Sequence, residues 1–203
     1  MLSNPAWPKE LAMNKRLPIC FALLVATCLA PTPAPAGGLR HNGITARRAE
    51  LYAQPLPAAS PEARAFRDPQ GRYSLTLPDG WNATTDSSGT TQLSFGPNWA
   101  TLLATGGSQP IDVNHQILQQ IQAQYKEFRL LNEGNLQVNG HAAHGSNATG
   151  INPKGARVSL LVISISAGSG HFLTVVSSAP NDQAKAVNGV IMQITQSIRF
   201  AGE

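Results

Sequence analysis

The sequence is poor in cysteine and in charged side chains. Among its 203 residues it has 2 cysteines, Cys20 and Cys28, and 13% of its side chains are charged. Both cysteines lie in the first 36 residues, which have the features of a cleaved signal. The predicted mature chain therefore has no disulfide, no thiolate metal site and no cysteine nucleophile. A charge content this low is unusual for a disordered chain and predicts a packed core.

Residues 1–36 resemble a secretory signal peptide. Lys15 and Arg16 precede the apolar run "LPICFALLVATCLA", and "APA" at residues 34–36 is a small-x-small cleavage site. The run, residues 17–30, is shorter than the helix of about 20 residues that spans a bilayer. We therefore expect export to the periplasm or the extracellular space.

Three alternatives stay open at this end of the chain. The signal could start at Met13, and it could be retained as an N-terminal anchor. "VATC", residues 25–28, resembles a bacterial lipobox, so lipid attachment at Cys28 is the alternative to cleavage after Ala36.

The positive charge of the chain lies outside its folded part. Residues 1–36 hold three basic side chains and one acidic one, which leaves 12 basic and 10 acidic side chains after cleavage. Residues 73–203 hold 6 basic and 7 acidic side chains. Nucleic-acid binding depends on a basic field, so we expect no nucleic-acid partner.

The sequence predicts a flexible linker over residues 37–65 and one folded domain over residues 66–201. The linker is rich in Gly, Ala, Pro and Arg, and "QPLPAASPEARA" contains three prolines without sustained periodicity. From Phe66 onward apolar and polar residues alternate regularly. Tyr73, Leu75 and Leu77 lie on one face of a predicted strand, which ends in the turn residues "PDG".

The remaining pattern predicts strands and two helices. "TTQLSFG" and "WATLLATG" are strand-like, residues 113–125 have helical spacing, and "EFRLLNEG" is again a strand. Asn139-Gly140 is the preferred dipeptide of a type I′ hairpin. Two strongly β-prone segments, 157–166 and 171–178, precede a last helix.

We expect Asn181 or Asp182 to cap the last helix, and "SIRF" to close the domain. The buried stripe of that helix is predicted to comprise Val187, Val190, Ile191, Ile194 and Ile198. Three strands, a helix, several antiparallel strands and a helix predict the α+β class, with helices packed on one antiparallel sheet.

The segments "GRYSLTLPDGW", "NLQVNGHAAHG" and "QITQSIRF" resemble the PsbP-like fold, which is shared with the Ran-binding Mog proteins. The chain is also similar to the non-catalytic C-terminal domain of some secreted bacterial zinc metalloproteases. The resemblance implies an α-β-α sandwich and an accessory role. The chain has no H-E-x-x-H motif, so peptidase activity does not carry over, and no family catalytic residue maps onto it.

The histidines are the main candidates for metal-binding or catalytic residues. His141 and His144 form H-x-x-H, but in a strand residues three apart point to opposite faces. With no acidic residue nearby in the sequence, we expect two solvated side chains rather than a metal site. His115 is expected on the polar side of its helix, and His171 begins a strand. No metal and no cofactor are predicted.

These observations favour an exported, non-catalytic accessory domain that docks to a protein or envelope partner of unknown identity. One alternative is a small-ligand carrier with an apolar pocket near Trp81 and Trp99. Another is a hydrolase whose site forms only in the fold, with His141, His144 or His171 as base. Trp81, Trp99, His141 and His144 are the candidate ligand or partner contacts, although Trp81 is expected mainly to pack in the core.

Overall fold

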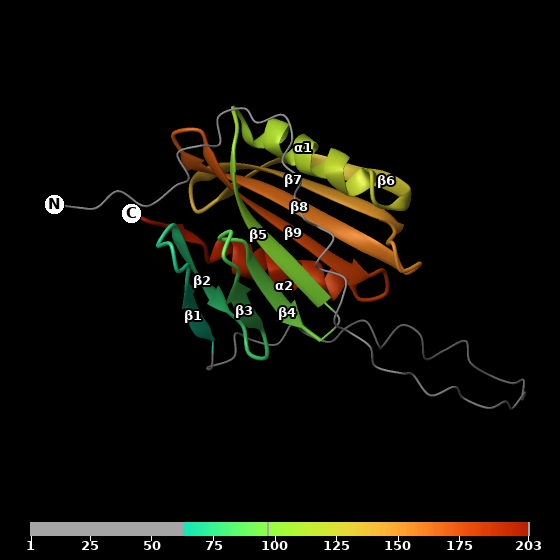
Figure 1. Cartoon of the computed structure of the whole chain (residues 1–203), viewed down its shortest axis with the longest axis horizontal. Helices are drawn as coiled ribbons and strands as arrows, with labels where there is room; N and C mark the ends of the chain where they lie inside the picture. The colour runs from blue at the N-terminus through green and yellow to red at the C-terminus, as the bar shows by residue number, and fades with distance from the viewer. Residues whose placement is uncertain (1–62, 97, 203) are drawn as a thin grey trace, which may run out of the picture.

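The computed structural model describes residues 63–96 and 98–202 (Figure 1). The predicted signal, and the predicted linker up to residue 62, lie outside this part of the chain. Within it, strands form two antiparallel sheets, and two helices pack against them. Neither helix of the described residues has the length and apolar content needed to cross a membrane.

The larger sheet has seven strands in the order β3-β4-β5-β9-β8-β7-β6, so β6 is an edge strand. Its strands are β3 (Asn82–Thr85), β4 (Thr91–Phe95), β5 (Asn98–Gly106), β6 (Lys126–Val138), β7 (His141–Ile151), β8 (Arg157–Gly168) and β9 (His171–Pro180). The smaller sheet has the order β1-β2-β10 and consists of β1 (Arg64–Arg67), β2 (Tyr73–Leu77) and β10 (Arg199–Phe200).

Helix α1 (Pro110–Gln122) covers one face of the seven-stranded sheet. Pro110 occupies the first turn, where its missing N–H costs no hydrogen bond. The buried stripe of α1 is Val113, Ile117, Leu118 and Ile121. Much of this stripe packs on Val158, Leu160, Val162 and Val176 of the sheet. Burial of each such side chain stabilises the fold by about 1.5–3 kcal/mol.

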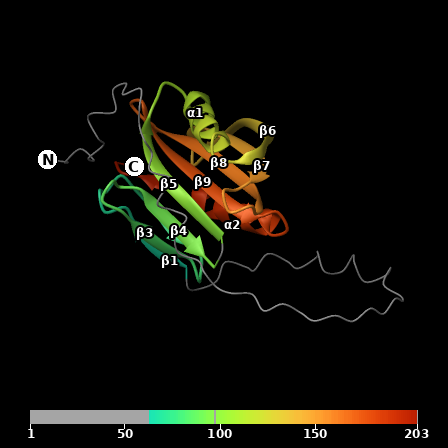
Figure 2. The same ribbon diagram turned by 45° about the vertical axis from the view of Figure 1, so that its right-hand side comes forward.

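Helix α2 (Ala184–Gln196) and the smaller sheet cover the opposite face (Figure 2). Val187, Ile191 and Ile194 of α2 are buried in one cluster with Tyr73 and Leu75 of β2. The same cluster takes in Ile163 and Val175 from the larger sheet. The molecule is therefore layered as helix, sheet, and helix with a small second sheet.

The predicted α+β class and the α-β-α sandwich are confirmed. The alternation of β2, the hairpin at Asn139-Gly140 and the helix near residues 113–125 all appear in the structure. Asn139 and Gly140 have φ of 49° and 83°, the left-handed pair that a type I′ turn requires.

Three details differ from the sequence-based expectation. Five strands precede α1 rather than three, because β1 and β3 are four-residue segments too short to show a clear alternation. The strands divide into two sheets instead of one. The first strand among the described residues also starts at Arg64, two residues before Phe66, since Arg64 pairs with Leu77 and its Nη2 donates to the carbonyl oxygen of Trp81 at 2.8 Å.

The predicted cap of the last helix is wrong. The N-cap of α2 is Gln183, and no side chain caps the helix. The backbone N–H of Gln183 instead bonds to the carbonyl oxygen of Pro180 at 2.9 Å. Asn181 and Asp182 therefore belong to a turn that follows β9, and the helix begins after it.

Candidate functional site

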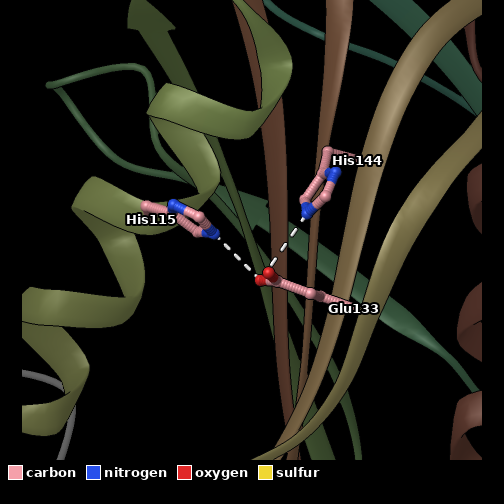
Figure 3. Close-up of side chains that lie close together, drawn as sticks. All are labelled: His115, Glu133 and His144. Carbon is pink, nitrogen blue, oxygen red and sulfur yellow. Dashed lines mark hydrogen bonds and ion pairs between the residues drawn. The ribbon is translucent and has the colours of Figure 1, made fainter.

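Two histidines and one glutamate from three different elements meet on the α1 side of the large sheet. His115 comes from α1, Glu133 from β6 and His144 from β7 (Figure 3). The Nε2 atom of His115 lies 2.9 Å from Oε2 of Glu133, and the Nε2 atom of His144 lies 3.7 Å from the same oxygen. One ligand-type atom from each residue lies within 4.8 Å of the others. We call these three residues the His–Glu cluster.

His144 is the buried member of the cluster. Its side chain is 4% exposed, compared with 45% for His115 and 35% for Glu133. Its Nδ1 atom lies 2.8 Å from Oδ1 of Asn135, which can only accept, so Nδ1 carries the proton. Its Nε2 atom is then a lone-pair acceptor that faces Glu133, and it has no hydrogen-bond partner among the described residues.

Buried polar groups hold the backbone of His144 in place. Asn114, directly before His115 in α1, is fully buried. Its Nδ2 donates to the carbonyl oxygens of His144 and Val162, both at 3.1 Å. Its Oδ1 accepts a hydrogen bond of 2.6 Å from the hydroxyl of Ser146. These bonds tie α1 to β7 and β8 beside the cluster.

A bulge in β6 places Glu133 on the correct face. Leu130 lies opposite Ala148, but the pairing shifts before Asn132, and Glu133 then lies opposite Ser146. Because strand side chains alternate, one extra residue exchanges the two faces for everything that follows it. Without the shift, Glu133 would face α2 instead of His115 and His144.

The hydrogen bond with His115 lowers the pKa of the Glu133 carboxyl below its ordinary value. Desolvation opposes this effect, and the electrostatic interaction of the carboxyl with the two imidazole rings adds to it. Glu133 is therefore an anion at neutral pH. An anionic oxygen between two imidazole nitrogens can accept protons, or it can share a divalent metal ion with them.

The structure both confirms and corrects the predictions for H-x-x-H. His141 and His144 do lie on opposite faces, since the His141 ring packs edge-on against Phe200 with centroids 4.8 Å apart, away from α1. Two expectations are wrong: His144 is buried rather than solvated, and Glu133 supplies the acidic group that the local sequence lacks. His115 and Glu133 were missed because they are 18 residues apart and no motif joins them.

The two candidate tryptophans do not share a site. Trp81 is 3% exposed, lies in the core beneath α2 and stacks on Phe95 at 5.8 Å between centroids, so its expected packing role is confirmed. Trp99 packs on the α1 side and lines a pocket of about 110 Å³. Tyr125, Asn152, Lys154 and Ser178 are among the other residues that line it.

Two large apolar side chains are exposed at consecutive positions of the edge strand β6. Leu130 is 45% exposed and Leu131 is 59% exposed. Leu131 is the extra residue at the register shift, and it has no partner in the pairing with β7. The bulge therefore turns a leucine toward solvent on an edge of the molecule.

Comparison with known proteins identifies the fold. No family model and no curated protein matches the sequence. Cyanobacterial PsbP (CyanoP) from Synechocystis is 12% identical with a TM-score of 0.51, covering 70% of this chain and 94% of that one. The Ran-binding protein Mog1p of Saccharomyces cerevisiae is 9% identical with a TM-score of 0.55, covering 68% and 95%.

The chain has the PsbP-like fold. The predicted resemblance is thus confirmed as a resemblance of fold. The similarity to the domain appended to zinc metalloproteases stays a prediction.

Proposed function

We propose that this protein is an exported, non-catalytic accessory module that docks to a protein partner in the cell envelope. The observation that carries the proposal is the exposed pair Leu130 and Leu131 on the edge strand β6. The fold supports it, since one protein of similar structure is named as Ran-binding. The N-terminal sequence pattern supports export.

The β6 edge combines exposed apolar area with unpaired backbone groups. An edge strand presents one row of N–H and C=O groups that the sheet leaves unpaired, and partner chains can add to such a row. Two register shifts interrupt β6, one between Lys126 and Arg129 and one at Leu131. These irregularities disfavour indiscriminate pairing with other strands, while the two leucines provide an apolar anchor.

A hydrolase with a histidine base has less support. A serine hydrolase needs a hydroxyl bonded to a ring nitrogen of its base. Among the described residues, the hydrogen bonds of His115 and His144 go to Glu133 and Asn135. The hydrolase hypothesis requires a histidine base beside a carboxylate, and the cluster contains both. Of the three proposed bases, His141, His144 and His171, only His144 belongs to the cluster.

A small-ligand carrier has less support as well. Binding pockets for drug-sized ligands have volumes of about 300–1,000 Å³. The pocket at Trp99 is about 110 Å³, and Trp81 lies in the core on the other side of the sheet. The predicted pocket near both tryptophans is therefore absent from the part of the chain described.

The test is a crosslinking capture from the cell envelope of the producing organism, read by mass spectrometry. The bait is the predicted mature chain, residues 37–203. A shortened chain that starts at residue 63 keeps β1 intact and removes the linker. Leu130→Ser/Leu131→Ser removes the apolar pair, and Phe95→Ser serves as the matched control, because Phe95 is equally exposed, at 48%, on another strand.

We expect one dominant partner that the wild-type chain and Phe95→Ser capture and that the double variant loses. Capture by the chain from residue 63 would assign docking to the folded domain, and loss of capture would assign it to the linker. Equal capture by the double variant, or no enrichment with any bait, would contradict docking through β6. Thermal unfolding of each variant establishes that a loss of capture does not reflect unfolding.

A further inference from the structure

We propose that the His–Glu cluster is a binding site for a divalent transition metal ion of the zinc type. This inference is independent of the proposed docking function, because it rests on different side chains. His115, Glu133 and His144 would supply two imidazole nitrogens and one carboxylate oxygen. That donor set suits Zn²⁺, whereas Ca²⁺ and Mg²⁺ prefer oxygen ligands throughout.

The first argument is the orphaned nitrogen of His144. Its Nε2 atom is buried and has no hydrogen-bond partner within the described residues, although it faces Glu133. A buried polar atom left unsatisfied is unfavourable, so native structures rarely keep one without a reason. A metal ion between this nitrogen and the Glu133 carboxylate would satisfy it.

The second argument is that the proton on His144 is already placed for metal binding. Metal-bound histidines usually donate their other ring N–H to a carbonyl or carboxylate, which fixes the tautomer. Here Nδ1 donates to Asn135 Oδ1 at 2.8 Å, so the lone pair of Nε2 points into the cluster. Asn114 holds the backbone of His144 from the other side.

The third argument is distance. A tetrahedral ion with ligands at about 2.0–2.2 Å separates any two ligand atoms by roughly 3.4 Å. The observed separations of 2.9 Å and 3.7 Å to Glu133 Oε2 lie on either side of that value. His115 and Glu133 are partly exposed, so small side-chain rotations suffice, and their open side leaves room for water as a further ligand.

Metal binding would replace the hydrogen bond between His115 and Glu133. The Nε2 atom of His115 would present its lone pair to the ion, which requires the neutral ring tautomer that carries its single proton on Nδ1. The Glu133 carboxylate is already anionic, and Nε2 of His144 already has its lone pair free.

The experiment measures binding of Zn²⁺ and Co²⁺ to the purified full-length chain with Cys20→Ser and Cys28→Ser. The cysteines are replaced because thiolates would bind the same ions elsewhere. Calorimetric titration gives the Zn²⁺ stoichiometry and affinity, and the visible spectrum of bound Co²⁺ reports nitrogen and oxygen ligands. We expect one ion per chain and a rise in the unfolding temperature that a chelator reverses.

Matched variants locate the ion. Asn135→Leu should weaken Zn²⁺ binding by about 10–100-fold, the usual effect of losing an outer-shell partner. His115→Gln and Glu133→Gln remove ligands and should weaken it further. His141→Gln, on the opposite face, and Glu127→Gln, on the same strand, should leave the affinity unchanged.

His115 and Glu133 are exposed enough that their variants should still fold, which circular dichroism checks. Two results would overturn the proposal. One is the absence of stoichiometric Zn²⁺ binding to the folded chain. The other is an affinity that His115→Gln and Glu133→Gln change no more than the two control variants do.

Discussion

At the scale of single residues, a buried ion pair joins two turns of the molecule. Arg72 and Asp68 have side-chain exposures of 2% and 0%. Arg72 Nε and Nη2 donate to the two carboxylate oxygens at 2.7 and 2.9 Å, and Nη2 also donates to the carbonyl oxygen of Gly89 at 2.6 Å. The hydrogen bond to Asp68 raises the pKa of Arg72 despite burial, so the guanidinium is charged in the folded state.

Arg72→Met should destabilise the fold by about 3–5 kcal/mol, because it leaves the Asp68 carboxylate buried without its partner. The control is Arg157→Met, which breaks an ion pair with Glu127 whose two side chains are 56% and 57% exposed. We expect that change to cost less than about 1 kcal/mol. Urea unfolding measures both, and equal losses would show that burial does not distinguish the two pairs.

The buried phenol of Tyr73 should make the stability of the fold fall at high pH. Burial raises the pKa of its phenol from 10.0 to about 12, and its hydroxyl lies 2.7 Å from that of Thr91. The stabilisation from the neutral phenol is fully present below pH 10. Between pH 10 and 12 the unfolded chain loses this proton while the folded chain keeps it, so stability falls by about 2–3 kcal/mol.

Tyr73→Phe should remove that part of the pH dependence, at the cost of the hydrogen bond to Thr91, which is worth about 1 kcal/mol. The measurement is the free energy of unfolding in urea at several values between pH 8 and 11.5, for both proteins. The wild-type curve should fall more steeply above pH 10. Parallel curves would mean that Tyr73 ionises equally in both states.

At the scale of elements, the turn between β6 and β7 also caps the end of α2. Asn139 Nδ2 donates to the carbonyl oxygens of Gln196 and Ile198 at 2.7 and 2.6 Å. The last carbonyls of a helix have no partner within it, so this side chain satisfies groups that would otherwise need water. Asn139 therefore performs two tasks, the left-handed turn and the helix end.

Asn139→Gly should destabilise the protein by about 1–2 kcal/mol, because glycine keeps the turn but loses both hydrogen bonds. Asn139→Asp should cost more, since it places a carboxylate beside two carbonyl oxygens. The control is Asn181→Ala, the predicted but absent cap of α2, which should change stability by less than about 0.5 kcal/mol. Denaturation midpoints test this ranking of the three stability losses. A larger loss for Asn181→Ala than for Asn139→Gly would contradict it.

At the scale of the whole molecule, the two proposed roles use different side chains of one edge strand, β6. The exposed leucines lie at the β6 edge, while the His–Glu cluster lies between α1, β6 and β7 on one face of the large sheet. Both depend on the same irregular strand, since the bulge exposes Leu131 and turns Glu133 toward α1. The opposite face is filled by α2 and the small sheet.

Much of the fold could be predicted because its signals are local. The alternation of Tyr73, Leu75 and Leu77, the Asn139-Gly140 dipeptide and the helical spacing after Val113 each depend on neighbouring residues. Those signals were enough to indicate the α+β class, whereas the sandwich was implied by the family resemblance. They failed where tertiary contacts decide, as at β1, whose four residues owe their strand conformation to pairing with β2.

The sequence by itself determined the order of the main elements and the buried face of each, since hydrophobic burial follows residue periodicity. Only the tertiary structure decided the candidate metal site. Glu133 reaches His115 and His144 because a bulge shifts the alternation of β6 by one residue, and helix α1 packs across two neighbouring strands. Neither event leaves a local pattern, because each depends on contacts between residues far apart in the chain.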